Sequence, residues 1–133
     1  MGQPAARQGD RVVGTDVHVV LVPAPPKDPV PTPLPHPFAG VLADGCSTDV
    51  LIMGRPAATV GSTATNTPGH VPAAPGTAFQ RPPANRATVQ QGSATVRING
   101  KPAARAGDPA TTCNDPVDVL AGTVVADGTV LVG

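Results

Sequence analysis

The stretch "SATVRINGKPAARAGD", from Ser93 to Asp108, has a close copy earlier in the chain, "STDVLIMGRPAATVGS", from Ser47 to Ser62. Each copy reads as a short strand, a tight turn carrying Gly100 or Gly54, and a second strand that ends in Gly-Asp or Gly-Ser. Two short alternating runs joined by a glycine-containing turn are typical of a β-hairpin. The repeat therefore predicts two equivalent hairpins.

Parts of the same unit stand at both ends of the sequence. "QPAARQGD", residues 3–10, matches the second half of the unit, and "ADGTVLVG", residues 126–133, matches the first half. If these two segments pair, the chain holds three hairpin units: residues 126–133 with 3–10, 47–62 and 93–108. Three copies of one unit suggest a pseudo-threefold axis. Chance recurrence in a chain rich in Ala, Pro and Gly is the alternative, and the length of the match argues against it.

Composition limits the kind of core that the chain can build. The 133 residues suit a single domain, residues 1–133, but only 2% are aromatic, with neither Trp nor Tyr. A core of Val, Ala, Leu and Ile buries little area per side chain, so we expect a further staple. No segment shows a useful apolar period of 3.6 residues. The predicted fold is all-β, a small pseudo-threefold cone of hairpins with Pro-rich loops and little or no helix.

Proline is concentrated in two of the segments between the hairpins. "VPAPPKDPVPTPLPHPF", from Val22 to Phe38, has proline at almost every second position. Because proline lacks an N–H donor, we expect this run to cross the surface as polyproline II and not as a helix or a central strand. The segment from Gly69 to Arg86 is also Pro-rich, and we expect it to be irregular.

Charge and targeting signals exclude several classes of protein. Nine basic and nine acidic residues balance, so the chain lacks the basic excess that a nucleic-acid or anionic-membrane surface needs. The sequence shows neither a signal peptide nor an apolar run approaching about 18 residues. We therefore expect a cytoplasmic protein, at least at first, whose two cysteines are thiols or metal ligands and not a disulfide.

One metal-binding side chain follows each hairpin after five to eight residues. These are His18, His70 and Cys113. A threefold arrangement would bring them toward one point on the axis, where His36, held between two prolines, can supply a fourth ligand. Three imidazoles and one thiolate form a closed set that suits one structural zinc ion. Such an ion would be the missing staple, because binding to a site that exists only in the folded chain stabilises the fold.

The alternative to a metal site is that His18 and His70 are surface imidazoles and Cys113 is a buried thiol. Cys46 aligns with Gly92 at the entrance to a hairpin strand, so we interpret it as a buried free thiol. It is the substitute ligand if Cys113 does not bind metal.

No catalytic arrangement emerges from the remaining polar residues, so we predict that the protein is not an enzyme. The serines at the hairpin edges have no histidine partner in the repeat, and Asp10 and Asp108 end Gly-Asp turns where local hydrogen bonding favours aspartate. Arg7 and Arg105 share one repeat position, which the middle unit fills with Thr59. We expect the two arginines to fix the packing between hairpins or to shape the base surface.

The strings "PAAR" at residues 4–7 and 102–105, with "PAAT" at 56–59 and the flanking "INGKPAARAGD", resemble the PAAR-repeat family. The resemblance covers all three repeat units. Members of this family cap the trimeric spikes of contractile injection machines, and their cone carries zinc near its apex, bound by three histidines and one cysteine. The resemblance assigns that set to His18, His36, His70 and Cys113.

The resemblance implies a structural tip that caps a trimeric, β-helical, VgrG-type spike with one copy per trimer and sharpens it for membrane puncture. The machine would be a type VI secretion system or an extracellular phage-tail-like particle. We expect assembly in the cytoplasm and then a place at the tip of a secreted or extracellular injection particle, in mechanical contact with the target membrane and without a nucleic-acid partner. Two alternatives stay open: an adaptor that attaches a separate effector protein to the spike, and a small metalloenzyme that uses the His/Cys cluster.

Overall fold

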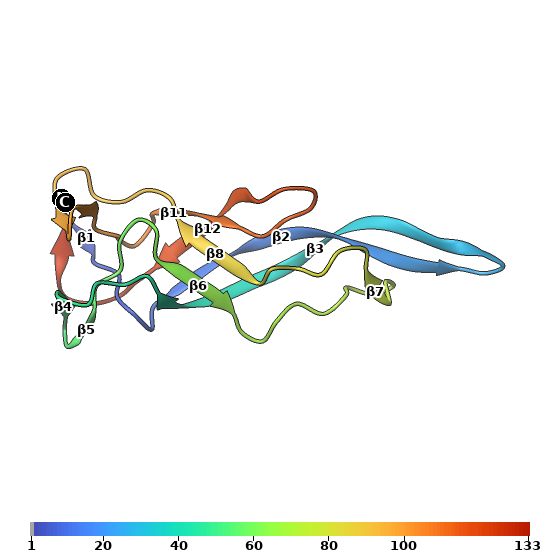
Figure 1. The fold of residues 1–133 in the computed structure, drawn as a ribbon, viewed down its shortest axis with the longest axis horizontal. Helices are drawn as coiled ribbons and strands as arrows, with labels where there is room; N and C mark the ends of the chain where they lie inside the picture. Colours follow the sequence, from blue (N-terminus) through green and yellow to red (C-terminus); the bar gives the residue numbers. More distant parts are fainter. Residues whose placement is uncertain (1) are drawn as a thin grey trace.

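The computed structural model describes residues 2–133 as strands and loops arranged along one long axis. Three small two-stranded sheets lie at one end, a sheet closed on itself lies in the middle, and one long hairpin projects from the other end (Figure 1). Residues 2–133 contain no helix, so none that could cross a membrane is found there. The all-β class expected from the sequence is confirmed.

The three small sheets form the base of the molecule. They pair β4 (Leu51–Ile52) with β5 (Arg55–Pro56), β9 (Arg97–Ile98) with β10 (Lys101–Pro102), and β13 (Leu131–Val132) with β1 (Gln3–Pro4). The third sheet confirms that segments from the two ends of the sequence complete one hairpin. The two continuous hairpins turn at Met53-Gly54 and Asn99-Gly100, where all four residues have positive φ. Such turns favour Gly and Asn, which explains the repeated glycine.

The three hairpins meet at an axis lined by alanines. The N–H of Ala6 donates to the carbonyl of Ala104, Ala104 donates to Ala58, and Ala58 donates to Ala6, with N···O distances of 2.9–3.0 Å. The preceding alanines of the three repeats are as deeply buried as these. They are Ala5, Ala57 and Ala103. A ring of three equivalent hydrogen bonds confirms the pseudo-threefold arrangement and explains why each repeat carries two consecutive alanines.

Each second strand ends in a turn of the same form. The turns contain a glycine with positive φ, and these are Gly9, Gly61 and Gly107, at 97°, 95° and 90°. The residue after each glycine accepts a side-chain hydrogen bond from the backbone N–H three residues before it. The acceptors are Asp10, Ser62 and Asp108, at 3.0, 2.9 and 2.7 Å. The serine of the middle repeat therefore makes the same contact as the two aspartates.

The central sheet closes on itself. Its strands, in order around the ring, are β2 (Arg11–Ala24), β3 (Lys27–Asp44), β6 (Thr63–Asn66), β8 (Arg86–Val89), β11 (Pro109–Thr112) and β12 (Val119–Val125). The ring closes because β12 pairs with the first residues of β2, while the short β7 (Ala78–Phe79) pairs with β2 further along. Closure removes the free edges that an open sheet would expose.

The apolar core fills the ring on its base side. Inward-facing side chains from all six strands form one cluster with the axial alanines. Its largest members are Val12, Phe38, Leu42, Val89 and Val124. Alternate residues of each strand point inward, as the period of a β-strand requires. The core is small, as the near absence of aromatic residues predicts.

The proline-rich run from Val22 to Phe38 corrects one expectation, because most of it lies in β3 and not in polyproline II. The prolines occupy alternate positions of β3. They are Pro29, Pro31, Pro33, Pro35 and Pro37. Alternate N–H groups of a strand point to the same edge. Ala39 lies an even number of residues from these prolines, and its N–H points away from β2 and donates to Asn66 Oδ1 at 2.9 Å. The missing donors therefore all lie on the edge that faces away from β2, where proline is tolerated.

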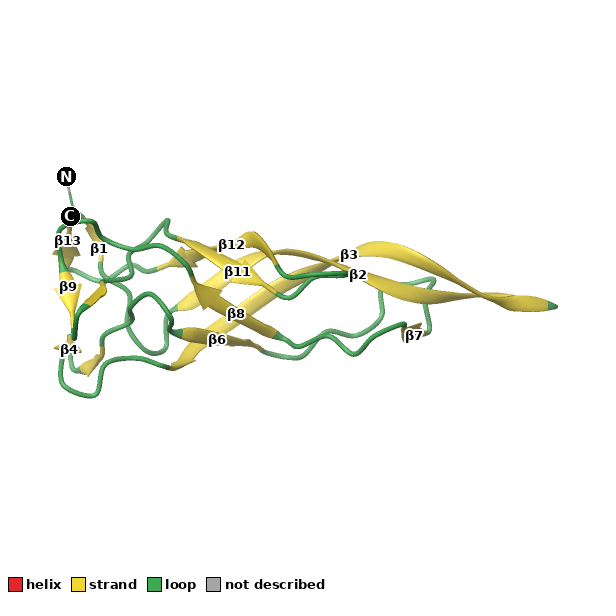
Figure 2. Ribbon diagram, turned by 45° about the horizontal axis from the view of Figure 1, so that its top comes forward, coloured by secondary structure: helices red, strands yellow, loops and turns green. Residues whose placement is uncertain are grey.

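The β2–β3 hairpin extends past the ring as a two-stranded ribbon (Figure 2). Two loops run along the root of this ribbon. The first, residues 67–85, is irregular except for β7, as expected, and donates from Thr77 and Gln80 to carbonyls of β2. The second, residues 113–118, donates from Asp115 N–H to the carbonyl of Val17 at 2.8 Å. The root of the ribbon is therefore a junction of both loops with β2 and β3.

Candidate metal centre

A cluster of buried polar side chains lies at the root of the ribbon, on the far side of the apolar core from the base. Asp16 and His18 are alternate residues of β2, so both point into the ring, with side chains 0% and 1% exposed. His36 lies directly opposite Asp16 in the β2–β3 register. His70 comes from the loop that follows β6, and Cys113 follows β11. Each of the three strand pairs of the ring therefore contributes to the cluster.

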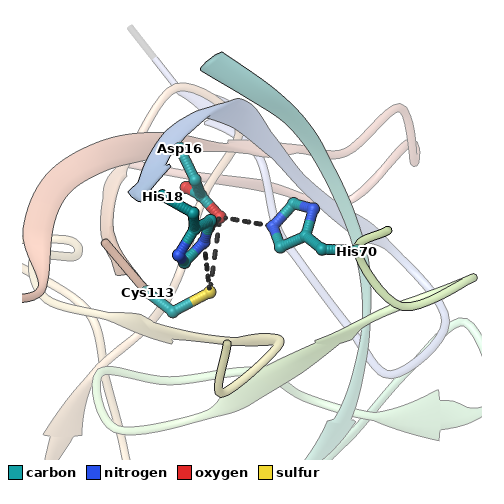
Figure 3. A group of neighbouring side chains, drawn as sticks. All are labelled: Asp16, His18, His70 and Cys113. Carbon is teal, nitrogen blue, oxygen red and sulfur yellow. Dashed lines mark hydrogen bonds and ion pairs between the residues drawn. The ribbon is translucent and has the colours of Figure 1, made fainter. Parts of the chain in front are cut away.

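Asp16 lies at the centre of this group (Figure 3). Its Oδ2 atom is 2.9 Å from His70 Nε2, 3.4 Å from Cys113 Sγ and 3.8 Å from His18 Nε2. His18 Nε2 is in turn 3.7 Å from Cys113 Sγ. These four donor atoms all lie within 4.8 Å of one another, close enough to bind a single ion.

His36 lies beside the cluster with both of its ring nitrogens hydrogen-bonded elsewhere. Its Nδ1 is 2.9 Å from the carbonyl of Leu34, and its Nε2 accepts from the N–H of Ala73 at 3.0 Å. The ring centroid of His36 is 5.5 Å from that of His18 and 5.6 Å from that of His70. Three of the four sequence-predicted ligands thus lie together with Asp16, and His36 lies beside them.

The sequence analysis missed Asp16. The signal was its spacing from His18, because two residues separated by one position share a face of a strand. That signal becomes readable only when residues 11–24 are known to form one continuous strand. The arrangement of the aspartate and the two histidines then follows from the pleat of β2 and from the two loops that cross its root.

The electrostatics of the cluster suit a bound cation. Burial raises the pKa of the Cys113 thiol to about 11, and the adjacent Asp16 carboxylate acts in the same direction. Burial also lowers the pKa of His18, which favours its neutral imidazole. Asp16 Oδ1 and His18 Nδ1 are buried without a hydrogen-bond partner among residues 2–133. A divalent cation would replace the thiol proton of Cys113, offset the repulsion between the resulting thiolate and the carboxylate, and bind a neutral imidazole.

The donor types match zinc. Imidazole nitrogen, thiolate sulfur and carboxylate oxygen are all zinc ligands, and four protein donors are the pattern of a structural zinc site. Phe79 covers the histidines, with its ring centroid 5.9 Å from that of His18 and 5.4 Å from that of His36. The residues present therefore fit the ion that the resemblance implies.

Asp115 supports the cluster from outside. Its Oδ2 is 3.6 Å from His18 Nδ1 and accepts from the Val19 N–H at 2.9 Å, while Arg81 Nη2 lies 2.6 Å from its Oδ1. Burial acts to raise the pKa of Asp115, but the Val19 N–H and the Arg81 guanidinium outweigh it and hold that pKa below its ordinary value. The charged Asp115 carboxylate beside Nδ1 would strengthen His18 as a ligand if its Nε2 bound an ion.

The second cysteine lies apart from the cluster. Cys46 is a free, half-buried thiol that packs against the apolar core near the base, and burial raises its pKa. The sequence interpretation as a free thiol is confirmed, although the side chain is less buried than expected.

These features define a class: a small β-protein with three nearly equivalent hairpins at its base, a closed ring of strands above them, and a polar cluster suited to a metal ion beneath a projecting ribbon. The model of the PAAR motif family matches residues 1–118 and, in a second overlapping match, residues 79–133. The chain belongs to the PAAR motif family. This is a family of structural proteins associated with the spike tips of type VI secretion. No curated protein matches the chain.

Proposed function

We propose that this protein is the structural tip that caps the trimeric β-helical spike of a contractile injection system. The observation that carries the proposal is the ring of hydrogen bonds that joins Ala6, Ala104 and Ala58. It makes one chain present three nearly equivalent hairpins around one axis. A symmetric trimer can contact such a base once per subunit, so that a single copy saturates the trimer.

The exposed side chains of the base suit a docking surface. Leu51 and Leu131 occupy equivalent positions in two hairpins, and each is 60% exposed. Arg97 occupies the third equivalent position, and Met53 is exposed at one of the turns. Apolar residues rimmed by charge are typical of a surface that another protein covers. The end of a β-helical spike has unpaired strand edges, which a cap of matching symmetry would protect.

The opposite end supports a mechanical role. One structural zinc ion, held by His18, His70, Cys113 and Asp16, would tie both crossing loops to β2 at the root of the ribbon. The ion would supply a fixed cross-link and no turnover. The set predicted from the sequence has His36 in place of Asp16, and it requires Nε2 of His36 to give up the N–H of Ala73, while Nδ1 can keep its bond to the carbonyl of Leu34. Asp16 already lies within reach of the other three donors, which favours the set that contains it.

In this proposal the cap is assembled on a VgrG-type spike in the cytoplasm and travels at the tip of a type VI or phage-tail-like injection particle. When the spike pushes along the long axis, the three hairpins would receive the force. The ribbon would transmit it to the target membrane. The closed ring between them resists shear because each of its strands is hydrogen-bonded on both sides over part of its length.

The test is the stoichiometry of the complex with the spike. The full chain is mixed with its cognate trimeric spike protein, and the mass of the complex is measured by size-exclusion chromatography with light scattering. We expect one chain per trimer. Three chains per trimer, or no complex, would contradict the proposal.

A further inference from the structure

The three repeats differ at the residue that follows the paired alanines. The first and third repeats have Arg7 and Arg105, and the middle repeat has Thr59. Arg105 Nη1 donates to the carbonyl of Gly133 at 2.9 Å, and Arg7 Nη1 lies 3.4 Å from the carbonyl of Met53. Met53 and Gly133 follow equivalent buried residues of two hairpins. Each arginine therefore reaches from its own repeat to the same carbonyl of the next one.

The middle repeat lacks this bridge. The equivalent carbonyl belongs to Asn99, but the Thr59 side chain is short and donates to the carbonyl of its neighbour Val60 at 3.3 Å. Between Thr59 and Asn99 lies a pocket of about 290 Å³, here called the Thr59 pocket. Its polar lining comes mainly from Cys46, Ser47, Asp49, Thr59, Asn99 and Lys101. At roughly ten times the ~30 Å³ that a water molecule takes in the liquid, the pocket has room for a side chain as large as arginine.

The lining of the Thr59 pocket suits a planar cation. Asp49 is exposed, and its Oδ2 accepts from Asn99 Nδ2 at 2.9 Å, which fixes the carboxylate at the mouth of the pocket. The Ser47 hydroxyl donates to Asn99 Oδ1 and so fixes the amide as well. A guanidinium group has five donors in a rigid fork, and a carboxylate is a partner of matching geometry. Lys101 is the cation of the lining, and its exposed, flexible ammonium offers no such fork.

The threonine of the middle repeat is accompanied by a second difference. Arg105 is held by Asp108 through Nη2 and Oδ1 at 2.9 Å, and the residue equivalent to Asp108 in the middle repeat is Ser62. The middle repeat therefore has neither the arginine nor the carboxylate, while its backbone turn is the same. What remains is an open pocket at a position where the other two repeats place a guanidinium.

We propose that the Thr59 pocket is a guanidinium site that receives an arginine side chain of the spike. This proposal rests on the proposed function, because it takes the spike as the partner that covers the base. The pocket lies between the segment that leads into β4 and the turn of the β9–β10 hairpin, both in the base that the spike would cover. On a symmetric trimer, three identical arginines would meet one open site and two sites already filled by Arg7 and Arg105.

The site itself is tested without the spike. The full chain is titrated with methylguanidinium while backbone amide signals are followed by NMR, and methylammonium serves as a probe of the same charge. We expect saturable shifts at Thr59, Asn99 and Asp49 with methylguanidinium and affinity weaker by roughly tenfold for methylammonium. The absence of a saturable shift, or equal shifts with both cations, would overturn the site.

Two variants locate the binding. Thr59→Arg places a guanidinium in the pocket from within, as the other two repeats do, and we expect it to abolish methylguanidinium binding. Asp49→Asn removes the charge of an exposed side chain, so we expect the fold to be kept. It should weaken methylguanidinium binding about tenfold. Thr65→Arg, an exposed threonine of β6, is the matched control and should bind as the unaltered chain does. Unchanged binding by Thr59→Arg would overturn the assignment to this pocket.

The source of the arginine is tested with the spike. We expect Thr59→Arg to weaken spike docking by roughly tenfold relative to Thr65→Arg. Equal docking of the two variants, with methylguanidinium binding intact in the unaltered chain, would overturn the spike as the source. Failure of the unaltered chain to dock would contradict the proposed function instead, and the NMR titration would still decide the guanidinium site.

Discussion

The N–H of Ala104 donates to the carbonyl of Ala58 at 3.0 Å, although the two residues belong to different repeats. The same bond recurs twice more around the axis, so no repeat satisfies its central backbone groups alone. Because buried backbone groups need partners, all three hairpins must be present for any of them to be stable. The fold of the base is therefore cooperative across the whole sequence.

Replacement of Ala58 by Leu should destabilise the protein by about 2 kcal/mol or more, because side chains on the axis meet those of the other two repeats. Urea unfolding followed by circular dichroism measures this change. Ala94→Leu, at an exposed position ahead of the β9–β10 hairpin, is the matched control and should change stability little. Equal stability of the two variants would show that the axis is not tightly packed.

The fourth metal ligand is identified by two substitutions of similar size. Asp16→Asn should weaken zinc binding by about 100-fold or more, because it removes the central carboxylate, whereas His36→Gln should change it only a few-fold. Affinity is measured by competition with a chromogenic chelator, and the bound ion is counted by native mass spectrometry. The reverse order of effects would instead support the set that includes His36.

Removal of the metal should loosen the root of the ribbon and leave the base intact. Chelation should lower the midpoint of thermal unfolding by about 10 °C, since a tightly bound ion stabilises a fold by a few kcal/mol. Hydrogen exchange should accelerate in residues 67–85 and 113–118 but not in the hairpins at the base. Cys113→Ser is the control, because its midpoint should not respond to the chelator. Uniform acceleration along the chain would contradict a local role for the ion.

The exposed leucines of the base should contribute to spike docking. Leu51→Asp and Leu131→Asp should each weaken docking about tenfold without a loss of thermal stability, because both side chains lie mostly in solvent. Val117→Asp, which is equally exposed but lies in the loop at the root of the ribbon, should dock normally. A stronger effect of Val117→Asp would place the docking surface near the ribbon and would contradict docking through the base.

The prolines of β3 should protect the ribbon from pairing with other chains. Replacement of Pro31 and Pro33 by threonine would restore two N–H donors on an open strand edge, which is a template for aggregation. Light scattering at raised concentration should then show association. Val30→Thr keeps the proline pattern and should stay monodisperse. Monodisperse behaviour of the double variant would argue that the edge is covered in another way.

The sequence was sufficient to predict the base. The repeated strings locate the hairpins. The split unit places Gln3 beside Val132, because one strand of a hairpin needs the other to pair its backbone groups. Periodicity within a hairpin is a local property, and local patterns can be read from one sequence. The spacing of His18, His70 and Cys113 after their hairpins follows from the same repeat, so their proximity was predictable as well.

The proline-rich strand and Asp16 could not be read in this way. Proline at every second position removes the N–H donors from one edge of a strand. A strand tolerates this only if its neighbours need backbone donors from the other edge, which depends on how β3 pairs with β2 and β6. Asp16 enters the cluster because β2 continues unbroken past the ring, which depends on the same pairing with β3. Both features depend on which strands pair in the folded protein, and the repeated sequence pattern does not encode them.

Pairing of β1 with β13 leaves Gln3 and Val132 side by side at the base, and the break between them is equivalent to the turns at Met53-Gly54 and Asn99-Gly100. The seam is thus one of three interchangeable places at which this ring of hairpins can be cut. A circularly permuted chain, joined through a short linker across the old seam and opened at either turn, should fold to the same cap.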